Sequence, residues 1–194
     1  MGVAFRGKGC FMSDYDFDRV NVLLAEDSPF IRSLLVNSLK VLGVGNVFAV
    51  EHGGDAIHFL QRVKNEPMRV GVQQIDIVIS NWDMHPIDGM MFLRWVRRHK
   101  DSPDRFVPFM LITSYTEPER ILQAREMGVT DMLAKPFTIK HIGEKLISII
   151  ERPRQFVHNK DFFGPDRRRQ KIDYGGPERR VLTDKSEGVE IIRG

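Results

Sequence analysis

The fold of this chain is decided by the stretch Ile75–Gly89, which reads IDIVISNWDMHPIDG. It begins with a short apolar run that ends at Ser80, and such a run is typical of a strand covered on both faces of a sheet. Beyond the run, Asn81 opens onto a loop. In open α/β sheets, ligands bind outside the carboxyl ends of the strands. The stretch therefore predicts a buried strand whose end belongs to a functional site.

Four other apolar runs predict further strands of the same kind. The five predicted strands are Val20–Ala25, Asn46–Val50, Ile75–Ser80, Val107–Thr113 and Asp131–Ala134. Each is followed by apolar residues at helical spacing, within residues 31–42, 56–63, 92–96, 117–127 and 142–150. Strands that alternate with helices in this way indicate an α/β fold with a doubly wound, parallel sheet and right-handed crossovers.

Length and composition fit one soluble globular domain with appendages. The chain has 194 residues, of which 42% are hydrophobic and 28% charged. No apolar run approaches the roughly 20 residues needed to span a bilayer, and no secretory signal is expected. The single cysteine, Cys10, excludes an internal disulfide and fits a reducing compartment. We therefore expect a cytoplasmic protein that has no membrane partner.

Three segments are expected along the chain. Residues 1–17 form a flexible N-terminal extension, residues 18–150 form the domain, and residues 151–194 form a basic, largely irregular tail. Lys and Arg exceed Asp and Glu by 29 to 26, and the whole excess lies in this tail. The tail lacks the apolar periodicity of a core. It holds two related Gly-Pro-acid-Arg-Arg units, within Phe162–Arg169 and Tyr174–Arg180.

The Arg clusters of the tail, Arg167–Arg169 and Arg179–Arg180, have three interpretations. They are a docking segment for a partner protein, a solubilising tail, or a contact to nucleic acid or anionic lipid. Each cluster lies beside an acid, Asp166 or Glu178, and the chain has no helix-turn-helix pattern. Sequence-specific binding of nucleic acid is therefore not expected.

Several of the predicted strands end in residues that carry chemistry. Glu26 and Asp27 come after the first strand, Asn81 after the third, Thr113 at the end of the fourth and Lys135 after the fifth. In a doubly wound sheet these ends gather around one crevice. Carboxylates supply oxygens for Mg²⁺, while a hydroxyl and an ammonium supply a donor and a positive charge for phosphate. The sequence thus predicts a site for a hard cation and a phosphoryl group.

Over about residues 18–150, the chain resembles the CheY-like receiver domains of two-component response regulators. The resemblance rests on the acidic pair after the first strand, S-N-W-D-M…D-G around the third, I-T-S ending the fourth and A-K-P-F after the fifth. It implies a five-stranded parallel sheet of flavodoxin or CheY type, in the order 2-1-3-4-5, with helices on both faces. It also implies Mg²⁺ and phosphoryl transfer from a histidine kinase or phosphotransfer protein to an aspartate.

The resemblance also assigns roles to individual residues. Glu26 and Asp27 correspond to the metal-binding acidic pair, Thr113 to the switch hydroxyl, and Lys135 to the phosphate-contacting lysine. The peptide bond between Lys135 and Pro136 is expected to be cis. Through the surface of the fourth helix, fifth strand and fifth helix, roughly 117–151, the family engages partners or a second copy, so a homodimer through this surface is one expectation.

Three positions depart from the family pattern. Asn81 falls where the phosphoacceptor aspartate stands, eight positions before the matched Gly89. Met132 falls at the aromatic switch position, and it is flexible and has no polar tip to reorient. His85 falls at the loop proline, with Pro86 one place late. A neutral amide oxygen is a poor nucleophile, so an acyl phosphate is not expected at Asn81. We therefore interpret the chain as an atypical receiver that is not an enzyme and acts by protein–protein interaction.

Other readings stay open at this point. Residues two apart in an extended segment point the same way, so Asp83 is a candidate ligand for Mg²⁺ at the rim of the pocket. A receiver phosphorylated at Asp83 is one alternative, and an engineered Asp→Asn block of the acceptor is another. A nucleotide-binding enzyme is disfavoured because no glycine-rich phosphate loop follows a strand.

Overall fold

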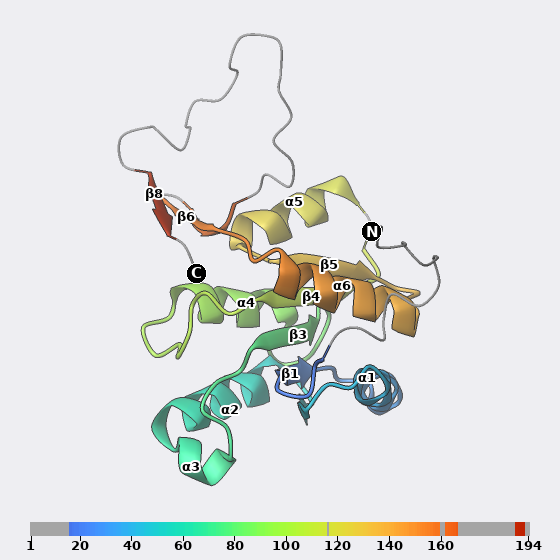
Figure 1. Ribbon diagram of the computed structural model, residues 1–194. Coiled ribbons are helices and arrows are strands. Elements are labelled where there is room, and N and C mark those ends of the chain that lie inside the picture. Colours follow the sequence, from blue (N-terminus) through green and yellow to red (C-terminus); the bar gives the residue numbers. More distant parts are fainter. Residues whose placement is uncertain (1–15, 116, 160–161, 167–188, 193–194) are drawn as a thin grey trace, which may run out of the picture.

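The computed structural model describes residues 16–115, 117–159, 162–166 and 189–192. Its centre is a parallel five-stranded sheet (Figure 1) with the strand order β2-β1-β3-β4-β5. The strands are β1 (Asn21–Ala25), β2 (Asn46–Val50), β3 (Ile77–Asn81), β4 (Phe109–Thr113) and β5 (Asp131–Ala134). The five predicted strands and the order implied by the resemblance are both confirmed.

Helices cover both faces of this sheet, as expected for a doubly wound fold. On one face the apolar sides of two helices pack against the strands, and on the other face those of three helices do. The first face carries α1 (Pro29–Val41) and α6 (Ile139–Glu151), and the second carries α2 (Gly53–Asn65), α4 (Gly89–Arg98) and α5 (Pro118–Met127). A short helix that the sequence did not predict, α3 (Pro67–Val70), follows α2.

The central strands are buried along their whole length, which fixes where their ends lie. Every residue of β3 and β4 is buried. Met110 faces one helical layer and Phe109 the other, where its ring lies 5.2 Å from that of Phe92. Because side chains alternate between the two faces of a strand, a shift of one residue would exchange the two layers. The register is therefore strongly determined, and so are the positions of Asn81 and Thr113.

Local capping signals start the helices that follow β1 and β3. Ser28 caps α1, since its Oγ accepts a hydrogen bond of 3.4 Å from the Ile31 backbone amide, and Pro29 occupies the first turn. Asp88 caps α4 and accepts a bond of 2.7 Å from the Met91 amide. Each cap holds the loop before it, so these residues also shape the crevice at the end of the sheet.

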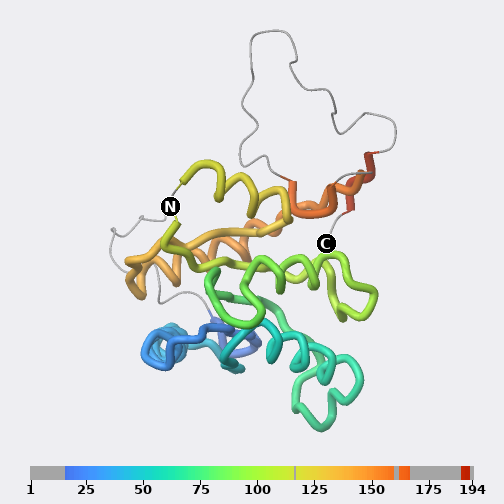
Figure 2. The backbone as a smooth tube through the Cα atoms, turned by 180° about the vertical axis from the view of Figure 1, so that it is seen from behind, coloured from blue at the N-terminus to red at the C-terminus, as the bar shows by residue number. Residues whose placement is uncertain are grey.

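The segment after α6 forms a second, smaller sheet. Its strands are β6 (Phe156–His158), β7 (Phe163–Pro165) and β8 (Glu190–Ile192), which pair antiparallel in the order β7-β6-β8. We call these three strands the C-terminal appendage. Figures 1 and 2 show it beside α5 and near the end of α4, on the body of the molecule. The sequence, from which a largely irregular tail is expected over residues 151–194, did not predict these three strands.

The reason for this difference is the length of the strands and the distance between them in the sequence. A strand of three residues is too short to show a period of two, and β6 and β8 are separated by more than thirty residues. The Arg clusters Arg167–Arg169 and Arg179–Arg180 lie outside the described residues. At the other end, Phe17 is buried, and its carbonyl oxygen accepts hydrogen bonds from Val20 and Gly45. The domain thus includes Phe17, one residue before the predicted boundary.

Within the described part of the chain, the structure has no helix with the length and apolar character required to cross a membrane.

Candidate functional site

The crevice at the carboxyl ends of β1, β3 and β5 brings four of the predicted site residues into contact. Asn81, at the end of β3, contacts the carboxylates of Glu26 and Asp27 and the ammonium of Lys135. Lys135 Nζ also lies 3.5 Å from Glu26 Oε2. Thr113 stands at the end of the neighbouring strand, where its Oγ1 accepts a bond of 2.8 Å from the Tyr115 backbone amide. The structure thus brings Asn81, Lys135 and the acidic pair together, as predicted, and places Thr113 on the neighbouring strand.

The side-chain amide of Asn81 is the centre of this cluster. Its nitrogen, Nδ2, donates to Glu26 Oε1 at 3.3 Å, Asp27 Oδ1 at 3.1 Å and the Asp83 carbonyl oxygen at 2.7 Å. Its oxygen, Oδ1, accepts from Lys135 Nζ at 3.1 Å. The reverse orientation would place Oδ1 against two carboxylates and the NH₂ group against an ammonium. Charge therefore fixes the amide in the observed orientation.

Glu26 is the most deeply buried carboxylate of the crevice, with 1% of its surface exposed. Burial raises its pKa above the usual 4.5, because the charged form loses its hydration. The Lys135 ammonium and a hydrogen bond from the Ser28 amide act in the opposite direction and favour the carboxylate. The net effect is a carboxyl group that takes up a proton more readily than an exposed glutamate.

Asp83 lies on the rim and does not join the two acids through its side chain. Its carboxylate is exposed and accepts a hydrogen bond of 3.1 Å from the Tyr115 hydroxyl. Only its backbone carbonyl faces Asn81. In the described residues, no group of three or more His, Cys, Asp and Glu side chains is arranged to hold a metal ion. In this arrangement the Asp83 carboxylate contacts Tyr115 and only its backbone carbonyl reaches Asn81, and its role as a ligand for Mg²⁺ stays a prediction.

Three residues of the rim were not predicted to belong to the site. The Tyr115 ring contacts Trp82 edge-on, with 5.8 Å between ring centroids. The guanidinium of Arg120, in the first turn of α5, lies 3.7 Å from the centre of the Tyr115 ring. The signal available in the sequence was an aromatic residue two places after Thr113, because a loop that leaves a strand end borders the crevice.

The oxygen atoms of the crevice are of the kind that binds Mg²⁺, but the Asn81 amide nitrogen occupies the point where they converge. Two carboxylate oxygens and a backbone carbonyl are hard ligands of the kind that Mg²⁺ prefers. In the structure all three face Asn81 Nδ2, an N–H donor that offers no lone pair to a cation. The site as arranged does not fit the metal. A cation could enter only if the amide left its bonds to these oxygens and to Lys135.

Met132 and Pro136 occupy the edge of the sheet beside the crevice. The Lys135–Pro136 peptide bond is cis, as the resemblance implied, and so is His85–Pro86. Met132 is half-buried on the edge strand β5. It lines two grooves, one between β5 and α5 and the other between β5 and α6. The predicted switch position therefore borders the surface formed by α5, β5 and α6.

Comparison with known proteins decides the family. Residues 22–147 match the model of the response regulator receiver domain. The chain belongs to this family. The match spans all five strands of the large sheet and ends within α6, before the C-terminal appendage.

Each of three similar proteins covers about two thirds of this chain. The chain is 28% identical over 133 residues to the chemotaxis protein CheY-3 of Vibrio cholerae, covering 69% of this chain and 93% of the relative. The solved structure of CheY4 from V. cholerae superimposes with a TM-score of 0.55 at 26% identity, covering 66% and 95%. The receiver domain of a Pseudomonas aeruginosa sensor histidine kinase, with magnesium coordinated in its active site cleft, has a TM-score of 0.56 at 23% identity, covering 68% and 98%. The last likeness shows the fold alone.

Proposed function

We propose that this receiver is an atypical response regulator that is not phosphorylated at Asn81 and acts by binding other signalling proteins. The observation that carries the proposal is the amide of Asn81, which stands at the phosphoacceptor position and is hydrogen-bonded at both ends. In this proposal the chain is not an enzyme. Its effect on signalling depends on how much complex it forms with a partner protein and on the structure of that complex.

The chemistry of the amide supports this proposal. Phosphorylation of a receiver requires a carboxylate oxygen that attacks phosphorus and forms an acyl phosphate. The Asn81 oxygen carries no net charge, and Lys135 already donates a hydrogen bond to it. The amide nitrogen has a delocalised lone pair, and its hydrogens point at the oxygens of Glu26, Asp27 and Asp83. Neither end of the amide is a competent nucleophile.

The same geometry predicts weak binding of Mg²⁺. Receiver domains typically bind this ion, and the P. aeruginosa receiver holds it in its cleft. Here the converging oxygens are already satisfied by Asn81 Nδ2. Binding would require loss of these hydrogen bonds, and the neutral amide would contribute no charge to the cation. We expect the affinity for Mg²⁺ to rise when residue 81 is an aspartate.

The partner surface in this proposal is the one formed by α5, β5 and α6. Strand β5 is an edge of the large sheet. A groove lies on each side of it, and Leu122 and Ile150 are exposed on the flanking helices. A histidine kinase, a phosphotransfer protein or another signalling protein is the expected partner, and a second copy of the chain would use the same surface.

Phosphorylation with a small donor tests the proposal directly. The wild type and Asn81→Asp are incubated with acetyl phosphate and Mg²⁺, and intact-protein mass spectrometry counts the phosphoryl groups. The wild type is expected to remain unlabelled, whereas Asn81→Asp gains one group, because the acidic pair and Lys135 are in place around residue 81.

A matched control locates any label. Asp83→Ala is made in the wild-type and in the Asn81→Asp background, and it should leave the labelling of both unchanged. Stoichiometric labelling of the wild type would sink the proposal. If that label disappeared in Asp83→Ala, the receiver would be phosphorylated at Asp83.

A further inference from the structure

Helix α5 has little anchoring of its own. Of its ten residues, only Ala124 is buried, while Ile121 and Met127 are half-buried. In the described structure, its most extensive contacts with other elements are with α4 and with β7 of the appendage. A helix with so few buried apolar side chains belongs to the low-stability end of a structure. The position of α5 therefore depends on what supports it from outside.

The appendage supports α5 through direct contact between backbones. Gly128 ends α5 with a φ of +94°, and a Cβ at this position would lie 3.0 Å from the carbonyl oxygen of Phe163. A Cβ on Gly164 would lie only 2.7 Å from the Gly128 Cα. Glycine on both sides permits this approach. Strand β7 thus presses against the turn that ends α5.

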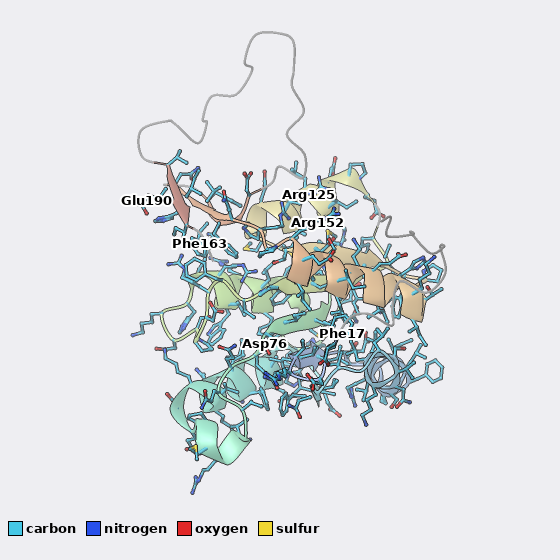
Figure 3. All side chains as sticks on the ribbon, viewed as in Figure 1. Phe17, Asp76, Arg125, Arg152, Phe163 and Glu190 are labelled. Carbon is cyan, nitrogen blue, oxygen red and sulfur yellow. The ribbon has the colours of Figure 1, made fainter. Side chains whose placement is uncertain are left out.

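Cation and aromatic side chains hold the appendage in this place. Phe156 and Phe163 are buried, and both rings contact Phe106 edge-on. The Arg105 guanidinium lies 3.5 Å from the centre of the Phe163 ring, and that of Arg97 lies 5.2 Å from Phe156. Figure 3 labels Phe163 on the part of the appendage next to the body. The docking surface therefore belongs to the end of α4 and the loop that follows it.

Arg97 ties the same surface to the turn after α5. Its guanidinium is fully buried and donates 2.9 Å bonds to the carbonyl oxygens of Gly128 and Arg105 and a 2.8 Å bond to that of Val107. Arg154, in the link between α6 and β6, donates a 2.9 Å bond to the Thr130 carbonyl oxygen. The C-terminal end of α5 is therefore held from both sides.

The other end of α5 reaches the crevice. Arg120 stacks on Tyr115, and the Tyr115 hydroxyl holds the Asp83 carboxylate. The backbone carbonyl of Asp83 in turn accepts from the Asn81 amide. A continuous series of contacts thus runs from Phe163 through α5 to Asn81. Such a series transmits a change only if an element along it has two arrangements, and α5, with its single buried residue, is the element suited to this.

We propose that the C-terminal appendage is an intramolecular clamp on α5, whose docking or release sets the arrangement of the Thr113–Tyr115 loop and of the groove between α5 and β5. The inference rests on the proposed function, in which aspartyl phosphorylation does not set this surface. Release of the clamp, instead of phosphorylation, then changes the groove between α5 and β5 that a partner protein binds. The family match ends at residue 147, so the appendage lies outside the matched receiver domain.

Hydrogen exchange on the full-length protein tests the clamp without any phosphorylation. Phe163→Ala removes the ring under Arg105. Gly164→Ala acts independently, because its new Cβ would collide with the backbone of Gly128. In both variants we expect the amides of residues 118–127 to exchange at least tenfold faster than in the wild type, together with those of β6 and β7. The amides of α1, on the opposite face, should keep their wild-type rates.

Glu190→Gln is the matched control, because Glu190 belongs to the same small sheet but is exposed. It should leave the exchange of α5 unchanged. Fast exchange in β6 and β7 with wild-type rates in α5 would overturn the clamp, since the appendage would have left without effect. Equal acceleration in α1 and α5 would do the same, because it would indicate a general loss of stability. Slow exchange in β6 and β7 of both variants would show that these contacts do not hold the appendage.

Discussion

At the scale of single residues, the side-chain amide of Asn81 organises the crevice, because it forms hydrogen bonds with charged groups on both sides. Asn81 is 7% exposed and lies between two carboxylates and an ammonium. An amide suits this place because it offers both a donor end and an acceptor end. The sequence places all four residues at strand ends, so their meeting could be predicted. The orientation of the amide and the contact between Asp83 and Tyr115 could not, because both depend on side-chain positions across different loops.

Glu26 makes a prediction about pH. Its pKa is raised in the folded state, so the folded protein binds more protons than the unfolded chain between the usual value of 4.5 and the raised one. The free energy of unfolding therefore falls as pH rises through this window. Glu26→Gln should abolish this slope, measured by urea unfolding at several pH values up to neutrality. Glu144→Gln, which alters an exposed carboxylate on α6, is the control and should keep the slope. Equal slopes in all three proteins would contradict the prediction.

At the scale of elements, the strands and most helices follow from local patterns, whereas the appendage does not. The runs that form β3 and β4 are apolar throughout, and Ser28-Pro29 and Asp88 mark helix starts by their own chemistry. In contrast, β6 is stabilised by Phe106 and Arg97, which are distant in sequence. Arg97 lies in the last turn of α4, where an arginine is ordinarily exposed. Its burial follows from carbonyl groups that only the folded chain brings together.

Removal of the Arg97 guanidinium is expected to destabilise the protein strongly. Burial lowers its pKa to about 9, so it is still charged at neutral pH and its hydrogen bonds are charge-assisted. Arg97→Met would leave the buried carbonyl groups of Gly128 and Val107 without this donor, at a cost of about 1–3 kcal/mol each. Urea unfolding measures the loss. Arg94→Met, at an exposed position of the same helix, should change the free energy of unfolding by less than about 0.5 kcal/mol. Similar values for both variants would contradict this account.

At the scale of the whole molecule, the small antiparallel sheet packs against the receiver domain through aromatic and cation–π contacts. Three aromatic side chains of the C-terminal segment are buried, namely Phe156, Phe162 and Phe163. The segment is basic and carries few aliphatic residues, so its composition alone resembles a disordered tail. Composition does not show that a few aromatic side chains of this segment contact Phe106 and the guanidinium groups of Arg97 and Arg105 on the body. While it is docked, the small sheet should therefore stabilise the body.

Deletion of the residues after Glu151 tests this stabilisation. A fully buried Phe side chain contributes about 1.5–3 kcal/mol relative to an exposed one. Three Phe side chains of the deleted segment are buried, and because area-based values are upper limits, we expect the deletion to lower the free energy of unfolding by about 3 kcal/mol. Urea unfolding followed by circular dichroism and tryptophan fluorescence measures the difference between the full chain and the deletion. Equal stability of the two proteins would mean that the docked appendage does not stabilise the body.

The bridging amide of Asn81 has a consequence for how the protein responds to its surroundings. The carboxylates of Glu26 and Asp27 need no bound cation to stay close to each other, because the Asn81 amide donates a hydrogen bond to each of them. Chelators should therefore leave the melting temperature of the protein unchanged. In a cell whose supply of divalent ions and of phosphorylated metabolites rises and falls, such a module would keep the geometry of its crevice, and its activity would follow the concentration of its binding proteins.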